Sequence, residues 1–180
     1  MAQLPQEFLT RMQEMLGDEF DAFLTSYDAP RTAGLRVNTK KCRTEDFPPL
    51  VPGTWKKIPW IPNGYFVPDG MRMGQSPLYT AGVFYLQEPS AMTPASRLPI
   101  EPGERVLDLC AAPGGKSFAM AMEMGNRGDI LSCDIHPHKL KLIENGAARL
   151  GITIVRTALV YILQYLAERN LPVISDFLAR

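Results

Sequence analysis

The sequence has few cysteines, few histidines and no net charge. Its 180 residues include three cysteines and two histidines, which form neither a C-x-x-C pair nor a metal-ligand spacing. A disulfide framework and a metal site are therefore not expected, and the cysteines are predicted to be thiols in a reducing compartment. Basic and acidic residues balance at 19 each, so the chain as a whole has no electrostatic preference for a polyanion.

Long apolar runs are also absent. No run approaches the roughly 18 to 20 residues needed to cross a bilayer, and residues 1–7 lack the charged and then apolar pattern of a secretory signal. Hydrophobic residues make up 46% of the chain and charged residues 21%, a composition typical of a globular protein with a core. We expect a cytoplasmic protein without a membrane partner, built as one domain with a smaller appendage.

Charge is unevenly distributed along the chain. Residues 1–28 hold six acidic residues and one basic residue, whereas residues 31–57 hold seven basic and two acidic residues. Charged stretches of this kind are typically solvated surface. The alternative is a patch that contacts phosphates, in which Arg36, Lys40 and Lys41 would take part.

Apolar residues recur at helical spacing in residues 5–27, which predicts two short amphipathic helices separated at Gly17 and Asp18. Residues 35–39 alternate between apolar and polar types, the pattern of a half-buried strand. The apolar positions of the two helices are expected to belong to the core: Phe8, Met12, Met15, Leu16, Phe20, Phe23 and Leu24.

Eleven of the sixteen prolines lie between residues 47 and 102, so this region is expected to hold short strands and turns and no long helix. Trp55, next to two lysines, could stack on a base, although packing in a core is the commoner role of such a ring. Ser90 is a candidate N-cap for a short helix.

From residue 103 onward, strands and helices alternate in the pattern that builds a parallel sheet. Strands are expected at 106–109, 130–133 and 152–155, and helices at 115–124 and 137–150.

The first of these strands runs into a turn of small residues that opens a helix. Small side chains let a ligand approach backbone N–H groups, and a helix N-terminus favours a carboxylate or a phosphate. One interpretation is a P-loop, since Gly115, Lys116 and Ser117 match the end of the pattern G-x-x-x-x-G-K-[ST]. However, the first glycine of that pattern would fall at Cys110, and Pro113 would stiffen a loop whose N–H groups must wrap phosphates.

The other interpretation is a nucleoside cofactor lying across the strand ends. Such a ligand needs an acidic residue after the next strand to accept hydrogen bonds from ribose hydroxyls, and Asp134 stands there, twenty residues after Gly114. A surface aspartate capping the following helix is the alternative. The loop lacks G-x-G-x-x-G, so a cofactor with a carboxylate and a sulfonium fits better than NAD, its carboxylate near Lys116 or the helix N-terminus. Asp108 is expected to orient the turn.

Residues 108–117, D-L-C-A-A-P-G-G-K-S, resemble at full length the cofactor motif of the Sun-type (nucleolar-protein/Sun) RNA 5-methylcytosine methyltransferases. Segments at 35–39, 85–92 and 134–139 are also similar to that family. The resemblance covers roughly residues 1–155.

This resemblance implies an α/β protein. Residues 85–180 would form a partial Rossmann-like S-adenosylmethionine-dependent methyltransferase fold, preceded by a small α/β N-terminal module in residues 1–84 that is associated with RNA, either ribosomal or transfer RNA. His136 and His138 are expected to belong to a helix start and not to a metal pair. Asp134 would hold the ribose of the cofactor, and the residues around the cofactor would be Cys110, Ala111, Ala112, Pro113, Gly114, Gly115 and Lys116.

The chain also departs from the family. Its members attack carbon 6 of cytosine with one cysteine and use a second, in a D-A-P-C-S-G segment, to assist release. Neither motif occurs here, and none of the three cysteines is a credible nucleophile, so no catalytic residue is predicted.

The end of the sequence departs further. Residues 157–180 are expected to start as an amphipathic helix unlike the family, and no aspartate follows the third strand. We therefore expect a reading frame truncated or shifted near residue 156, and a chain that does not methylate alone. A noncatalytic protein that retains a cofactor or RNA surface is the remaining alternative.

Overall fold

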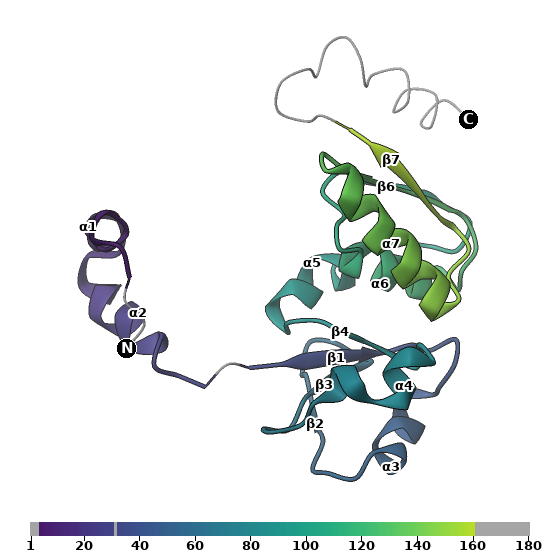
Figure 1. Cartoon of the computed structure of the whole chain (residues 1–180), viewed down its shortest axis with the longest axis horizontal. Helices are drawn as coiled ribbons and strands as arrows, with labels where there is room; N and C mark the ends of the chain where they lie inside the picture. Colours follow the sequence, from purple (N-terminus) through teal and green to yellow (C-terminus); the bar gives the residue numbers. More distant parts are fainter. Residues whose placement is uncertain (1–3, 31, 161–180) are drawn as a thin grey trace. The chain divides into compact units, whose positions relative to one another are not determined.

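A computed structural model describes residues 4–30 and 32–160, and these fall into two compact units that divide after Thr32 (Figure 1). The first unit runs from Met1 to Thr32 and the second begins at Ala33. Within the described residues, no helix is long and apolar enough to cross a membrane.

The first unit consists of two helices, as predicted. Helix α1 spans Gln6–Leu16, a single 3-10 turn spans Gly17–Glu19, and helix α2 spans Phe20–Ser26. The prediction that its apolar residues form a core is wrong, because none of the residues in these helices is buried and Met15 is 67% exposed. Two short helices provide too little surface to enclose a side chain. Their rings make only pairwise contacts, such as Phe23 with Tyr27 at 5.3 Å between centroids.

The second unit begins with an antiparallel sheet in the order β2-β3-β1-β4. Its elements are short, as the density of prolines predicts. The strands are β1 Gly34–Val37, β2 Lys56–Lys57, β3 Gly64–Phe66 and β4 Phe84–Leu86. The helical segments are α3 Phe47–Leu50, α4 Pro77–Thr80 and 3-10 turns at Thr44–Asp46 and Met73–Gln75.

Strand β1 is buried on both faces, and the prediction of a half-buried strand is therefore wrong. All four of its residues are buried, and so is Asn38 just beyond it. Arg36 is only 5% exposed, because its guanidinium donates to Asn63 Oδ1 at 3.3 Å and to the Met92 carbonyl at 3.2 Å. Partners far along the chain therefore make two polar side chains compatible with burial.

A second, parallel sheet follows in the order β5-β6-β7. Its strands alternate with helices, as predicted. The elements are β5 Arg105–Asp108, α6 Gly115–Glu123, β6 Asp129–Asp134, α7 Pro137–Leu150 and β7 Val155–Leu159. The segment between the two sheets holds a 3-10 turn, Ser90–Met92, and a short helix, α5 Thr93–Ser96.

Strand β7 starts at Val155, three residues later than predicted. Helix α7 ends at Gly151 in a left-handed conformation, and the Ile152 N–H returns to the Ala147 carbonyl at 2.9 Å. Thr153 is then bonded to Asn126, so the chain enters the sheet only after this return. Because β7 continues to Leu159, the expected helix from residue 157 is also wrong at its start, and its remainder lies outside the described residues.

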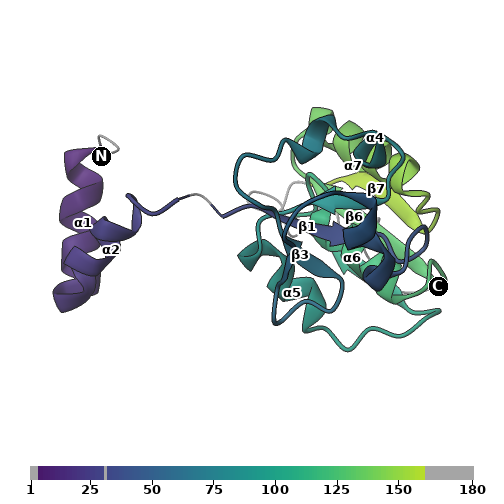
Figure 2. The ribbon, with the colours of Figure 1, turned by 90° about the horizontal axis from the view of Figure 1, so that it is seen from below.

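The C-terminal end of α7 reaches the antiparallel sheet beside α4 (Figures 1 and 2). Asn38 donates to the Leu150 carbonyl at 2.8 Å, and Lys41 donates to the Arg149 carbonyl at 2.9 Å. Arg149 in turn donates to the Tyr79 carbonyl at 2.6 Å, with its guanidinium 4.0 Å from the ring centroid. These donors satisfy carbonyl groups that a helix end leaves unpaired, so the two sheets are joined at this end.

Candidate functional site

The loop between β5 and α6 lies at the carboxyl edge of the parallel sheet, where ligands bind in sheets of this kind. The Ala111 N–H donates to the Cys133 carbonyl at 2.9 Å, and the Gly114 N–H donates to the Ala111 carbonyl at 2.7 Å. The Ala112–Pro113 peptide bond is cis. The loop is therefore curled and tied to the end of β6.

Two adjacent glycines open α6, and each lets a neighbouring side chain pack closely against the backbone. Gly114, the N-cap residue, has φ +112°, and a Cβ there would lie 2.3 Å from the ring of Phe118. A Cβ on Gly115 would lie 2.7 Å from Gln87 Nε2. A side chain at either position would displace these neighbours, so the two glycines allow Phe118 and Gln87 to pack against the start of α6.

Asp108 holds the base of this loop. Ser132 Oγ donates to Ser117 Oγ at 2.7 Å, and Ser117 Oγ donates to Asp108 Oδ2 at 2.8 Å. Lys116 Nζ lies 3.7 Å from Asp108 Oδ1 and donates to the Cys110 carbonyl at 2.7 Å. The buried Asp108 thus fixes α6 and the lysine, as expected of a residue that orients the turn.

A cavity of about 450 Å³ lies against this loop. Of the eight residues predicted to bind a cofactor, five line it: Ala111, Ala112, Pro113, Gly115 and Lys116. Cys110, Gly114 and Asp134 are not part of its lining. The other lining residues come from a second segment that sequence reasoning did not assign to the site: Tyr85, Leu86, Gln87, Glu88, Ala91 and Pro94. The one signal for this segment was its membership of the motif at 85–92.

Asp134 ends β6 next to the residue that holds the loop. Its side chain is 8% exposed, its Oδ1 accepts the His136 N–H at 3.0 Å, and its carbonyl accepts the Val160 N–H at 3.1 Å. It does not cap α7, whose N-cap residue is His136 with no side-chain cap bond. The alternative of a surface aspartate capping that helix is therefore wrong.

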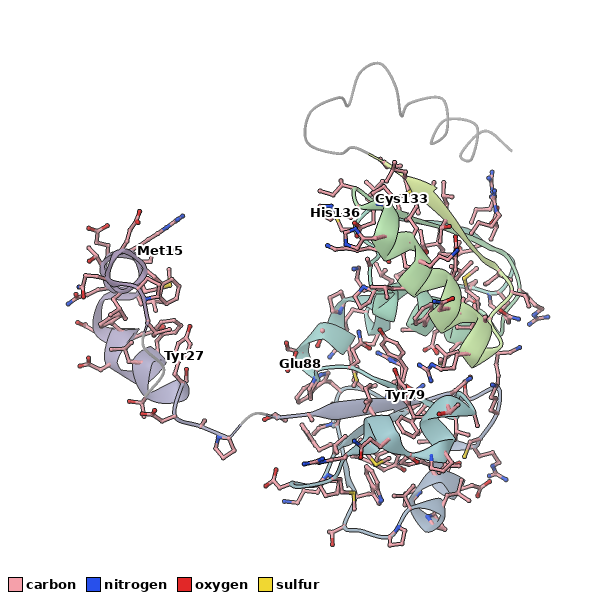
Figure 3. The ribbon with its side chains drawn as sticks, viewed as in Figure 1. Met15, Tyr27, Tyr79, Glu88, Cys133 and His136 are labelled. Carbon is pink, nitrogen blue, oxygen red and sulfur yellow. The ribbon has the colours of Figure 1, made fainter. Side chains whose placement is uncertain are left out.

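Glu88 lines the cavity and lies just before the 3-10 turn that leads to α5 (Figure 3). Its carboxylate accepts hydrogen bonds from Ser90 Oγ and from the Ala91 N–H, the latter at 3.0 Å. The bond from Ser90 lowers the pKa of Glu88 below its ordinary value, so the side chain stays ionised. The prediction of Ser90 as an N-cap is wrong, since Glu88 caps this turn in its place.

Two of the three cysteines, Cys42 and Cys133, have thiols whose pKa is raised. Cys133 is fully buried, and burial followed by the charge of Asp108 raises its pKa to about 11. Burial also raises the pKa of Cys42, whereas Cys110 is exposed on the loop. A thiol whose pKa is raised is a poor nucleophile near neutral pH.

Metal ligands do not gather in the described part of the chain. No group of three or more His, Cys, Asp or Glu side chains is placed to hold an ion there. His136 (Figure 3) precedes α7 and His138 lies in its first turn, with their rings 5.5 Å apart.

Two basic residues of this stretch, Arg36 and Lys41, make internal contacts, whereas Lys56 and Lys57 are exposed. Arg36 is buried, so its predicted role in contacting phosphates is wrong. Lys41 donates to two carbonyl groups, those of Ala81 and Arg149, and Lys40 is exposed. Trp55 packs edge-on against the Phe47 ring at 5.1 Å between centroids, the commoner of its two expected roles.

Comparison with known proteins gives two adjacent family matches. Residues 4–89 match the N-terminal domain of 16S rRNA methyltransferase RsmF, and residues 95–174 match the model of 16S rRNA methyltransferase RsmB/F. The second match extends past residue 155, where the resemblance was expected to end.

One curated relative is the ribosomal RNA small subunit methyltransferase F of Enterobacter sp. (strain 638), 38% identical over 160 residues. The match covers 83% of this chain, which spans 33% of that protein's length.

Two solved structures share the fold. A methyltransferase homolog protein from Pyrococcus horikoshii is 28% identical with a TM-score of 0.76, over 87% of this chain and 52% of that one. NSun6 from the same organism, solved with SFG, has a TM-score of 0.78 at 16% identity, over 87% of this chain and 65% of that one.

Proposed function

Because this chain belongs to the RsmB/F family of 16S rRNA methyltransferases, we propose that its parallel-sheet region binds S-adenosylmethionine for the methylation of carbon 5 of cytosine in ribosomal RNA. The main observation behind this proposal is the cavity, which five of the eight predicted residues line. Ribosomal RNA is favoured over transfer RNA because both family models are named for 16S rRNA.

The residues present fit this cofactor. Gly115 lines the cavity without a side chain, and the helix N-terminus at this residue would offer N–H groups to a carboxylate. Lys116 adds a positive charge on the same side. S-adenosylmethionine supplies an activated methyl group on its sulfonium. The chain's own part is to hold and orient that group.

We assign the amino acid end of the cofactor to the cavity and its ribose to Asp134. Asp134 Oδ1 is engaged by the His136 N–H, which leaves Oδ2 as the acceptor for ribose hydroxyls. Cys110 to Lys116 would lie between the two ends, since the Ala111 N–H ties the loop to Cys133, the neighbour of Asp134.

We further propose that this chain binds but does not methylate by itself. The attack on carbon 6 of cytosine needs a thiolate, and Cys133 is buried with its pKa raised to about 11. Neither cysteine motif of the family occurs in the sequence. Residues 1–84 would help to hold RNA, although β4 spans Phe84–Leu86, so that strand crosses the proposed boundary. The cytoplasmic location stays a prediction.

A P-loop remains a weaker alternative. In this loop the N–H groups of Ala111 and Gly114 are already bonded to carbonyl groups, and Pro113 has none. Few donors are then left to wrap a triphosphate. Nucleotide-dependent hydrolysis that is abolished in Lys116→Ala would support the P-loop.

The test is calorimetric titration of the 180-residue chain with S-adenosylhomocysteine. We expect binding that Asp134→Ala weakens by about tenfold or more, because hydrogen bonds to a charged group are lost. Asp129→Ala is the matched control, since Asp129 lies at the opposite end of β6 and pairs with Arg156. Absence of binding in a folded sample, or equal losses in both variants, would refute the assignment.

A further inference from the structure

One buried polar atom beside the cavity has no partner. Gln87 Oε1 is buried and accepts no hydrogen bond within the described residues, although Gln87 lines the cavity. Its Nε2 donates to the Ala91 carbonyl at 3.1 Å. This bond identifies which end of the amide is nitrogen, because an oxygen in that place could not hydrogen-bond to the carbonyl oxygen. Unpartnered buried acceptors are rare and costly, so this one calls for an explanation.

The amide of Gln87 lies directly over the start of α6. A Cβ on Gly115 would be 2.7 Å from Nε2 and 3.2 Å from Cδ of Gln87. The backbone of Gln87 is held in place by its N–H, which donates to the Gly34 carbonyl at 3.0 Å. Oε1 is covered in this arrangement, so a turn of the flexible side chain is needed to present it to the cavity. That turn breaks the bond from Nε2 to the Ala91 carbonyl, but it costs Oε1 no hydrogen bond.

The cavity has two chemically different sides. Lys116 and the N-terminus of α6 present donors and positive charge. On the other segment, the ionised carboxylate of Glu88 presents acceptors, and Gln87 Oε1 adds one once its side chain turns toward the cavity. A free α-amino acid group has the complementary pair, since its carboxylate only accepts and its ammonium only donates.

Resting on the proposed function, we infer that Gln87 is a specificity-determining residue, whose Oε1 accepts a hydrogen bond from the α-ammonium group of the cofactor's methionine portion. The carboxylate of that portion then faces Lys116 and α6. In this arrangement Gln87 distinguishes ligands that carry the amino acid from nucleosides that lack it.

Two ligands test this inference by calorimetry with the full chain. S-adenosylhomocysteine carries the amino acid end, and 5′-methylthioadenosine keeps the adenosine and thioether without it. In Gln87→Met, which keeps the length and removes the acceptor, we expect affinity for S-adenosylhomocysteine to fall by about tenfold to a hundredfold, the loss expected for a hydrogen bond to a charged group. Affinity for 5′-methylthioadenosine should change by less than about twofold, because its contacts remain.

Matched variants secure the result. Gln75→Met makes the same chemical change at an exposed glutamine outside the cavity and should change neither affinity. Gln87→Glu keeps an acceptor oxygen and should restore preference for the amino acid. Gly115→Ala, whose Cβ would displace the Gln87 amide, should repeat the selective loss and serves if Gln87→Met does not fold.

The outcomes separate the inference from the function on which it rests. Equal losses for both ligands would mean that Gln87 only shapes the cavity, and would overturn its role. Unchanged affinity for S-adenosylhomocysteine would overturn it as well, including the case in which Gln87 faces a base of the RNA. If the unaltered chain binds neither ligand, the proposed function fails, and the inference fails with it.

Discussion

Two helices of the parallel-sheet region meet the antiparallel sheet, and their ends are treated in opposite ways. The carbonyl groups at the C-terminus of α7 are closed by donors from Asn38 and Lys41. The N-terminus of α6 faces a cavity at Gly115 and Lys116. The closed end behaves as a structural joint and the open end as a binding site, so unused hydrogen-bonding groups distinguish the two better than burial does.

Two amide side chains, one at each helix end, differ in the same way in how many of their hydrogen-bonding groups are used. Asn38 uses both ends, since its Nδ2 donates to the Gly82 and Leu150 carbonyl groups and its Oδ1 accepts the Lys40 N–H. Gln87 uses only its Nε2. Substitutions at the closed end should therefore reduce stability, whereas substitutions at the open end should mainly reduce binding.

The largest effect is expected for Gly82→Ala at the closed end. Gly82 has φ +70°, and a Cβ there would lie 2.0 Å from the Arg149 carbonyl oxygen, a backbone atom that cannot turn aside. We expect the free energy of unfolding to fall by about 3 kcal/mol or more, from overpacking together with left-handed strain. Urea unfolding measures this loss.

Gly70→Ala is the matched control. Its φ of +78° is similar, but a Cβ there would meet nothing within 4 Å. It should therefore lose only the strain component, about 1 kcal/mol. Equal losses at both positions would show that the joint at Arg149 is not tight.

Asn38→Ala is expected to rank second. It leaves the Gly82 and Leu150 carbonyl groups without their donor, at a cost of about 2 to 3 kcal/mol. Gln87→Ala removes one bond, to Ala91, and should cost about 1 kcal/mol or less. Denaturant titration of both variants compares the two ends directly, and a larger loss for Gln87→Ala would reverse the contrast.

The third expected effect depends on pH and concerns Cys133, whose carbonyl accepts the Ala111 N–H of the loop before α6. Cys133 is buried, and its pKa is raised from 9.0 to about 11, so the folded state favours the neutral thiol. The stability that the neutral Cys133 thiol contributes to the folded state is present below pH 9. It is lost between pH 9 and 11, because the thiol of the unfolded chain releases its proton first. We expect a loss of about 2 kcal/mol over this interval.

Other groups titrate in the same range, so Cys133→Ala is the reference. From pH 9 to 11, the unfolding free energy of the unaltered chain minus that of this variant should decrease by about 2 kcal/mol. A difference that stays constant with pH would mean that the thiol is solvated in the folded state.

Strands β5 and β6 and helices α6 and α7 were predicted closely because local signals determine them. Pro137 and Gly151 mark the two ends of α7, and the helix α6 begins at the predicted residue. Burial of Arg36 and Asn38 could not be predicted, since it depends on partners such as Leu150, 112 positions away. Alternation in a short strand looks the same whether its polar residues face water or buried carbonyl groups.

The candidate site was predicted on one side only. Small residues before α6 announce a turn that a ligand can approach, and five of the seven predicted loop residues line the cavity. The segment from Tyr85 to Pro94 carries no such signal, because its role depends on how the antiparallel sheet approaches α6. An unpartnered acceptor such as Gln87 Oε1 is visible only after folding.

The smallest effect is expected on RNA affinity. Of the three basic residues proposed to contact phosphates, Arg36 is buried and Lys41 is bonded to two carbonyl groups, so Lys40 is the one that keeps that role. Lys40→Gln should lower affinity for ribosomal RNA fragments slightly and reduce the slope of log affinity against log salt by about one. Lys57→Gln, an exposed lysine of β2, is the matched comparison. If both variants leave the slope unchanged, the basic stretch is solvated surface. The open end of α6 would then be a site for the cofactor, with no phosphate contact from this stretch.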